Sequence, residues 1–210
     1  MLYSHILWDF NGTILNDVET GIRSVNALLA RRKLKTLDTL EEYRDYFTFP
    51  IINYYRTLGF DFESESFDDI AIEWVTEYLN NEKYAFINSG IVDVLKRIQI
   101  PQIILSASEI NMLTKQLTDR GIIGYFDEIL GLDNLKAGSK IDIAKEWISR
   151  VKPSAAVLIG DTVHDYETAS AVGIDCILIT GGHQNKGTLL KCGVPVLDDI
   201  ADIFNYLNFS

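Results

Sequence analysis

Residues 4–13 read SHILWDFNGT, and this stretch decides the fold. The apolar run Ile6–Trp8 ends at Asp9, and Gly12 follows three residues later. A short apolar run that ends in polar or small residues is typical of a strand buried on both faces of a parallel sheet. Doubly wound sheets bind ligands at the carboxyl ends of their strands. We therefore expect Ser4–Phe10 to form a strand that presents Asp9 to a crevice.

The rest of the chain alternates between short apolar runs and stretches with helical spacing. Strands are predicted at Gln102–Ser106, Glu128–Leu130, Ala155–Gly160 and Ile174–Thr180, with an edge strand at Val194–Val196. Helices are predicted at Ile91–Ile98, Met112–Leu117 and Ile141–Ile148. Strand, helix and strand in succession imply right-handed crossovers, so the expected fold class is α/β, with a three-layer parallel sheet.

One long segment interrupts this alternation. From Val18 to Tyr84 the patterns are helical, at Val18–Lys33, Leu40–Phe47 and Phe67–Asn80. We expect an α/β core domain of residues 1–17 and 85–210, and an α-helical cap domain of residues 18–84. The aromatic residues of the cap are expected to pack against one another more than to bind a ligand; they are Tyr43, Tyr46, Phe47, Phe49, Tyr54 and Tyr55.

The composition is that of an acidic globular protein. Of the 210 residues, 47% are hydrophobic and 23% are charged, which excludes a disordered chain. The net charge of −11 argues against nucleic acid or an anionic membrane as a partner, because both need a positive surface. No apolar run approaches the roughly 18 residues of a membrane span, and the first nine residues lack a signal-peptide pattern. Cys176 and Cys192 make no disulfide framework, so we expect a cytoplasmic protein.

Four polar features fall at expected strand ends or helix starts. They are Asp9–Thr13, Ser106, Lys140 ahead of a helix, and Gly160–Asp165. Each alone has an ordinary structural explanation, such as a turn aspartate or a helix N-cap. Because the carboxyl ends of parallel strands meet at one edge of a sheet, we expect the four to converge on one site.

This order of motifs resembles the haloacid dehalogenase superfamily, and most closely its phosphoglycolate phosphatase-like branch with a helical cap. The similarity spans essentially the whole chain, from D-x-x-G-T at Asp9 to the run GDTVHDYETASAVGI that starts at Gly160. It implies a Rossmann-like sheet with strand order 5-4-1-2-3. It also implies a hydrolase in which Asp9 attacks phosphorus and forms an aspartyl-phosphate, with Mg²⁺ between the carboxylates and the phosphate.

The residue chemistry agrees with these implied roles. Asp9 is the expected nucleophile, and Asp9, Asp161 and the backbone carbonyl of Asn11 are oxygen ligands suited to Mg²⁺. Asp165 lies one helical turn after Asp161 and can face the same metal or orient its waters. Lys140 neutralises phosphate and offsets the carboxylates. The expected phosphate-binding groups are Ser106, Ala107, Lys140 and the amides of Phe10 and Asn11. Gly12 is expected to allow a tight turn, and Thr13 to hold the geometry of Asp9.

Asn11 departs from the family pattern. Phosphatases of this family carry an Asp at this position, which protonates the leaving oxygen and later deprotonates the attacking water. An amide cannot relay a proton, and losing general acid–base catalysis, worth about 10²–10⁴ in rate, raises the barrier by roughly 3–5 kcal/mol. His164 and His183 can exchange protons near neutral pH. We expect neither to replace the missing acid; His164 is expected to pack or cap near the helix start, and His183 to lie in a loop near the mouth of the site.

These observations predict a Mg²⁺-dependent phosphatase of small phosphomonoesters, weakened by Asn11. Its partner would be a small phosphorylated metabolite, with phosphoglycolate as the expectation from family analogy alone. The chain would be a monomer or a homodimer. Two alternatives stay open: a phosphotransferase or mutase of the same superfamily, and a catalytically weakened protein that binds a phosphate ligand.

Overall fold

A six-stranded parallel sheet forms the centre of the computed structural model, which describes residues 3–132 and 139–207. The strand order is β5-β4-β1-β6-β7-β8, and each neighbouring pair is parallel. The strands are β1 His5–Trp8, β4 Gln102–Glu109, β5 Glu128–Leu132, β6 Ala156–Gly160, β7 Asp175–Ile179 and β8 Val196–Leu197. The first five of them follow the order 5-4-1-2-3 that the resemblance implies, and β8 adds an edge strand beside β7. The expected α/β fold class is confirmed.

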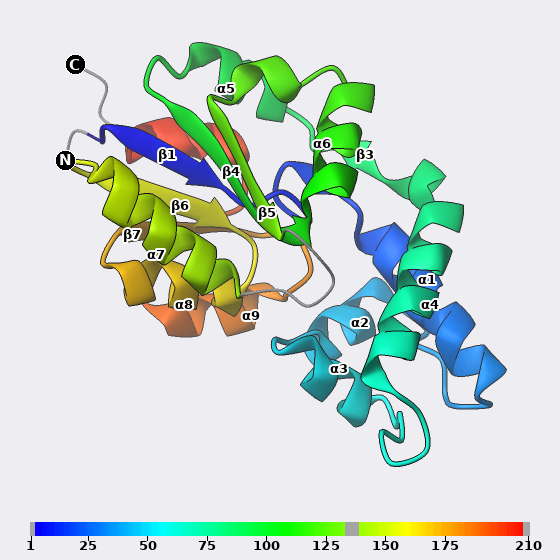
Figure 1. Ribbon diagram of the computed structural model, residues 1–210. Helices are drawn as coiled ribbons and strands as arrows, with labels where there is room; N and C mark the ends of the chain where they lie inside the picture. The colour runs from blue at the N-terminus through cyan, green and yellow to red at the C-terminus, as the bar shows by residue number, and fades with distance from the viewer. Residues whose placement is uncertain (1–2, 133–138, 208–210) are drawn as a thin grey trace.

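Helices cover both faces of this sheet, which gives three layers (Figure 1). The helices on one face are α5 Ile91–Arg97, α6 Ile110–Asp119 and the 3-10 helix η4 Ile200–Asn205. The helices on the other face are α7 Lys140–Val151, α8 Val163–Val172 and the short α9 Lys186–Leu189. Two further 3-10 turns are η2 Ile123–Tyr125 and η3 Leu190–Cys192.

Strand β1 shows why the apolar runs are continuous. Ile6 and Trp8 pack in the hydrophobic cluster on one face, and Leu7 packs in the cluster on the other face. All three side chains are fully buried. Successive side chains of a strand point to opposite faces, so a strand covered on both faces needs apolar residues at every position.

Helices α1–α4, with the 3-10 turn η1, form a separate lobe beside the sheet (Figure 1). Their bounds are α1 Val18–Arg31, α2 Leu40–Tyr46, α3 Ile51–Thr57, α4 Phe67–Asn80 and η1 Glu82–Tyr84. The segment that contains them, residues 18–84, is called the helical insertion below. It has its own hydrophobic cluster, which includes Leu28, Tyr54 and Tyr55. A two-stranded antiparallel ribbon, β2 Leu15–Asn16 and β3 Phe86–Ile87, brackets the insertion where the chain leaves the sheet and returns to it.

The sequence pattern misses some of these elements. Helix α3 and the β2–β3 ribbon are not predicted, β4 continues three residues past Ser106, and β8 overlaps the predicted edge strand only at Val196. The expectation of aromatic packing in the insertion is confirmed for Tyr43 and Tyr54, which are buried edge to face.

The structure also bears on the two cysteines and on membrane-spanning helices. Cys176 is buried and Cys192 is half-buried, and both are free thiols. Within residues 3–132 and 139–207, no helix combines the length and apolar character needed to cross a membrane.

Candidate active site

The polar features that the sequence singles out lie at the carboxyl ends of adjacent strands. Asp9 follows β1 and Asp161 follows β6, and these strands are neighbours at the centre of the sheet. Asp165 lies in the first turn of α8, and Lys140 is the first residue of α7. Three of the four expected features, at Asp9, Lys140 and Asp161–Asp165, therefore meet at one edge of the sheet.

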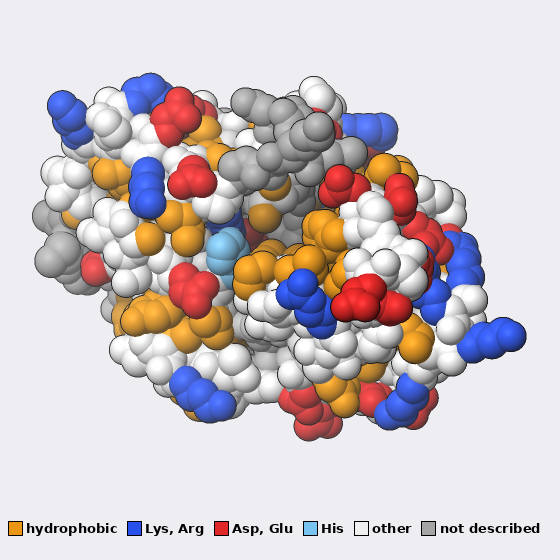
Figure 2. Space-filling model, turned by 60° about the horizontal axis from the view of Figure 1, so that its bottom comes forward, with side chains coloured by type: hydrophobic (Ala, Val, Ile, Leu, Met, Phe, Trp, Pro, Cys, Tyr) orange, Lys and Arg blue, Asp and Glu red, His pale blue; other side chains and the backbone are white. Residues whose placement is uncertain are grey.

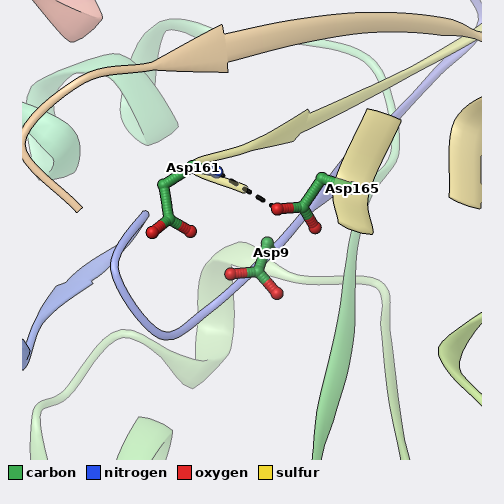
Figure 3. Close-up of side chains that lie close together, drawn as sticks. All are labelled: Asp9, Asp161 and Asp165. Carbon is green, nitrogen blue, oxygen red and sulfur yellow. Dashed lines mark hydrogen bonds between the residues drawn. The ribbon is translucent and has the colours of Figure 1, made fainter. Parts of the chain in front are cut away.

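The three aspartates form a compact acidic cluster (Figure 3). Asp9, Asp161 and Asp165 each offer a carboxylate oxygen, and these oxygens lie within 4.8 Å of one another. All three residues are at most 8% exposed. Carboxylates held this close out of water repel one another, so the cluster is suited to a bound cation.

Lys140 partly compensates this charge. Its ammonium lies 2.5 Å from Asp9 Oδ1 and 2.5 Å from Asp165 Oδ1, and the residue is buried. Burial lowers the pKa of Lys140, but Asp165 and Asp9 raise it above its usual value, so the side chain stays charged. One ammonium against three carboxylates leaves an excess of negative charge at the site.

The pKa values of the aspartates respond to this imbalance. Burial raises the pKa of Asp9 well above its usual value. The Lys140 ammonium lowers this pKa in part, whereas the neighbouring carboxylates of Asp165 and Asp161 raise it further. Burial likewise raises the pKa of Asp161 to about 6. For Asp165, Lys140 and hydrogen bonds from Thr162 outweigh burial and lower the pKa. A divalent cation would restore the charge of Asp9 and Asp161.

Asp165 is fixed by the start of α8. Its Oδ2 accepts hydrogen bonds from the Thr162 hydroxyl at 2.6 Å, from the Thr162 amide at 2.9 Å and from the Asp161 amide at 3.2 Å. Asp165 Oδ1 accepts from Lys140. Both oxygens thus have partners, and the side chain acts as a capping box and as the support of Lys140.

Three glycines leave room for these carboxylates. A Cβ atom on Gly12 or Gly182 would lie 2.1 Å from Asp161 Oδ2, and one on Gly160 would lie 2.2 Å from Asp165 Cγ. Gly12 also has a φ of 77°, as expected for the tight turn after Asp9. The roles of Gly160 and Gly182 escape sequence analysis, because they depend on contacts with side chains elsewhere in the fold.

The predicted phosphate-binding residues lie along the same edge. Ser106 is buried in β4, and its Oγ accepts a hydrogen bond from the Ser108 amide at 3.1 Å. Ala107 follows it in β4. The ring of Phe10 is buried in the core, so only its backbone could face a ligand. The Thr13 hydroxyl donates to Asp161 Oδ1 at 3.2 Å, so Thr13 supports Asp161 rather than the turn around Asp9.

Asn11 is held on three sides. Its Nδ2 donates to Asp17 Oδ2 at 2.8 Å and to the Tyr78 hydroxyl at 3.2 Å, and its Oδ1 accepts from the Ser108 hydroxyl at 2.8 Å. This pattern of one acceptor and two donor contacts suits an amide. A carboxylate at this position would face the carboxylate of Asp17.

Asp17 and His183 form a buried pair that sequence analysis missed. His183 Nε2 lies 3.1 Å from Asp17 Oδ1, and His183 Nδ1 lies 2.8 Å from the Tyr43 hydroxyl. Asp17 also accepts from the Gly12 amide at 2.9 Å and from the Tyr78 hydroxyl at 2.7 Å. Burial lowers the pKa of His183, but Asp17 raises it to about 9. Asp17 precedes α1 like an N-cap residue, yet its side chain makes no capping bond, so the local pattern hides its actual role.

The His183 loop also connects the site to the helical insertion. The His183 amide donates to Asp161 Oδ2 at 2.6 Å. From α2, Arg44 donates to the carbonyls of Gly182 and Gly181 at 2.8 and 2.7 Å. His183 thus lies near the site, as expected, but as a buried and paired residue.

Comparison with known proteins agrees with this geometry. The model of the haloacid dehalogenase-like hydrolase family matches residues 6–179. The chain belongs to this family. A phosphoglycolate phosphatase of Pseudomonas fluorescens is 22% identical over 193 residues, which cover 86% of this chain and 70% of the relative.

Several solved structures share the fold. A haloacid dehalogenase-like hydrolase from Streptococcus pneumoniae has a TM-score of 0.79 at 21% identity, covering 98% of this chain and 99% of that one. The protein tyrosine kinase PtkA of Mycobacterium tuberculosis has a TM-score of 0.82 at 18% identity, covering 99% of both chains. In sequence, PtkA is 29% identical over 86 residues, which cover 40% of this chain and 30% of PtkA.

The substitution Gly182→Ala is expected to destabilise the site. The new Cβ would overlap Asp161, so the free energy of unfolding should fall by about 1–3 kcal/mol. Urea denaturation measures this change, with Gly124→Ala as the control, because a Cβ there would meet nothing within 4 Å. Equal stability of the two variants would contradict the packing described here.

The His183–Asp17 pair predicts a pH-dependent contribution to stability. Folding raises the pKa of His183 from an unfolded value of about 6.5 to about 9. The contribution is therefore complete below pH 6.5 and is lost as the pH rises through 9. His183→Gln should lower the free energy of unfolding by about 1.5–3 kcal/mol at pH 6 and by less at pH 10. Urea unfolding with a chelator present tests this.

The matched control is His5→Gln, because burial lowers the pKa of His5. Its effect on stability should stay constant between pH 8 and pH 10. If the effect of His183→Gln on the free energy of unfolding is equally constant over that range, His183 is not a charged imidazolium paired with Asp17.

Proposed function

We propose that the protein is a Mg²⁺-dependent phosphatase that hydrolyses small phosphomonoesters through an aspartyl-phosphate on Asp9. The observation that carries this proposal is the buried cluster of Asp9, Asp161 and Asp165, with the Lys140 ammonium paired to Asp9 and Asp165. Residues 1–17 and 85–210 would form the core domain, and the helical insertion, residues 18–84, would be the cap that selects the substrate.

The residues present suit Mg²⁺. Asp9, Asp161 and the backbone carbonyl of Asn11 would hold the ion, since carboxylate and carbonyl oxygens are the ligands it prefers. The raised pKa values of Asp9 and Asp161 favour a cation as the partner of these carboxylates. Bound there, Mg²⁺ would neutralise phosphate charge and favour the ionised form of Asp9.

Asp9 would act as the nucleophile. A carboxylate oxygen of Asp9 attacks phosphorus, the bond from phosphorus to the ester oxygen breaks, and the electron pair leaves with that oxygen. Lys140, the Ser106 hydroxyl and the amides after Asp9 would stabilise the charge on the phosphoryl oxygens. Water then hydrolyses the aspartyl-phosphate and regenerates Asp9.

Asn11 would limit this reaction at two points. Its amide donates to Asp17 and Tyr78, it cannot transfer a proton to the leaving oxygen, and it cannot deprotonate water. Leaving groups that depart as stable anions would therefore react best.

Phosphoryl transfer to an acceptor other than water is the second candidate. Asn11 favours it, because an aspartyl-phosphate without a base for water lives longer. The partial similarity to the tyrosine kinase PtkA also supports it. Release of inorganic phosphate in the absence of an acceptor distinguishes hydrolysis from transfer.

The substitution Asp9→Asn is expected to abolish turnover. It removes the nucleophile without changing side-chain size, so phosphate release from acetyl phosphate with Mg²⁺ should fall by more than about 10³-fold. The control is Asp202→Asn, which removes an exposed carboxylate of η4. If Asp9→Asn keeps the activity of the control, the proposed mechanism is wrong.

The substitution Asn11→Asp is expected to increase turnover of esters with poor leaving groups. The new carboxyl would face Asp17, which would raise its pKa and suit it to donate a proton. Turnover of an alkyl phosphate should rise by about 10²–10⁴-fold. Because Asn-Gly sequences deamidate, intact-mass measurement should accompany the assay to show that Asn11 keeps its amide in the native protein. No gain for the variant would mean that Asn11 does not occupy the acid–base position.

A further inference from the structure

The segment between α2 and α3 places two aromatic rings on histidines of the core. Phe47 stacks on His183 at a centroid distance of 4.9 Å and an angle of 27°. Phe49 stacks on His164 at 4.6 Å and 21°. Gln184 fastens the same segment, because its Nε2 donates to the Phe47 carbonyl at 3.0 Å while its Oε1 accepts from the Val163 amide at 2.7 Å. The ring of Phe49 therefore lies over the start of α8, and the ring of Phe47 lies over the loop after β7.

This position adjoins the acidic cluster. His164 lies between Asp161 and Asp165 in the first turn of α8, and its side chain is 16% exposed. Phe49 is also only partly buried. The surface view shows a hollow between the lobes in which a histidine side chain and hydrophobic side chains are visible together (Figure 2). A third planar ring could pack against this pair at the rim of the site.

The basic side chains of the insertion are already engaged by other groups. Apart from Lys33, which follows the far end of α1, its basic side chains contact an acid, a carbonyl or an aromatic ring. These side chains are Arg23, Arg31, Arg32, Lys35, Arg44, Arg56 and Lys83. Arg44 is nearest in sequence to Phe49, and it is bound to the Gly181 and Gly182 carbonyls. A leaving group with its own carboxylate, such as glycolate, would have to displace one of these contacts, whereas a neutral ring would find Phe49.

Asn11 independently restricts the leaving group. A phenol ionises with a pKa of about 10, as tyrosine does, whereas an aliphatic alcohol resembles water and has a far higher pKa. A phenolate can therefore depart without the proton that Asn11 cannot supply.

We propose that the site acts on phosphate monoesters of phenols, whose ring packs against Phe49 and His164. This inference rests on the proposed phosphatase function and adds the class of substrate. An oxygen of Asp9 bonds to phosphorus, the bond between phosphorus and the phenolic oxygen breaks, and the phenolate leaves with the electron pair and takes a proton from water. A water molecule then cleaves the aspartyl-phosphate and releases inorganic phosphate.

Binding of two non-hydrolysable probes tests the ring preference without any chemical step. Phenylphosphonate and cyclohexylphosphonate carry the same anion and rings of similar size, but only the phenyl ring is planar and aromatic. With Mg²⁺ present, calorimetry should show phenylphosphonate binding about 2- to 10-fold more tightly. Phe49→Leu should bring this ratio close to one, and Phe49→Tyr should retain it.

The matched control is Phe62→Leu, which removes a ring of the same insertion that packs against Phe67 instead. It should leave the ratio unchanged. Equal affinity of the native protein for the two probes, or an unchanged ratio in Phe49→Leu, would overturn the inference. If Phe49→Leu does not fold, the ratio of the native protein's affinities for the two probes tests the inference alone.

Turnover separates this inference from the proposed function. The native protein should cleave phenyl phosphate at least about 10²-fold faster than benzyl phosphate, which keeps the ring but leaves as an alkoxide. Acetyl phosphate has a good leaving group and no ring. If acetyl phosphate is cleaved in an Asp9-dependent manner but the phenyl preference is absent, only the inference fails. If acetyl phosphate and phenyl phosphate both stay intact, the phosphatase function itself fails.

Discussion

The ammonium of Lys140 holds three parts of the chain at one point. It bridges Asp9 at the end of β1 and Asp165 at the start of α8, and it is itself the first residue of α7. A buried ammonium is tolerated only when it is paired, so each element depends on the position of the other two. The three glycines next to the carboxylates strengthen this dependence, because they let backbone approach Asp161 and Asp165 directly.

The layered fold is largely readable from the sequence, because buried parallel strands leave a clear apolar pattern. Strands β1, β4, β6 and β7 all lie where continuous apolar runs predict them. Helix α3 is not readable in this way: it has seven residues, and its buried residues Tyr54 and Tyr55 are adjacent rather than spaced along a stripe. The β2–β3 ribbon has two residues in each strand, which is too short for an alternation to show.

The candidate site also contains residues that the sequence predicts and residues that it does not. Asp9, Asp161 and Lys140 follow predictable strand ends or precede a predictable helix, so their meeting could be expected. Asp17 and His183 are separated by 166 residues and meet only in the folded chain, where Asp17, bound to the amide of Gly12 after β1, lies against the loop after β7. The local sequence indicates a helix cap at Asp17 and a loop residue at His183. Neither local pattern indicates that the two side chains pair.

The loop of residues 181–185 binds both the core and the helical insertion. It touches Asp161 through Gly182 and His183, and it binds the insertion at Tyr43, Arg44 and Asp45. Elsewhere the insertion contacts the core at Phe49, Tyr78 and Glu82, and its own hydrophobic cluster holds the rest together. An insertion transplanted from a relative would therefore have to bring a compatible residue 43–47 segment, or exchange this loop along with it. The structural connection between core and insertion thus includes the loop of residues 181–185 as well as the β2–β3 ribbon, where the chain enters and leaves the insertion.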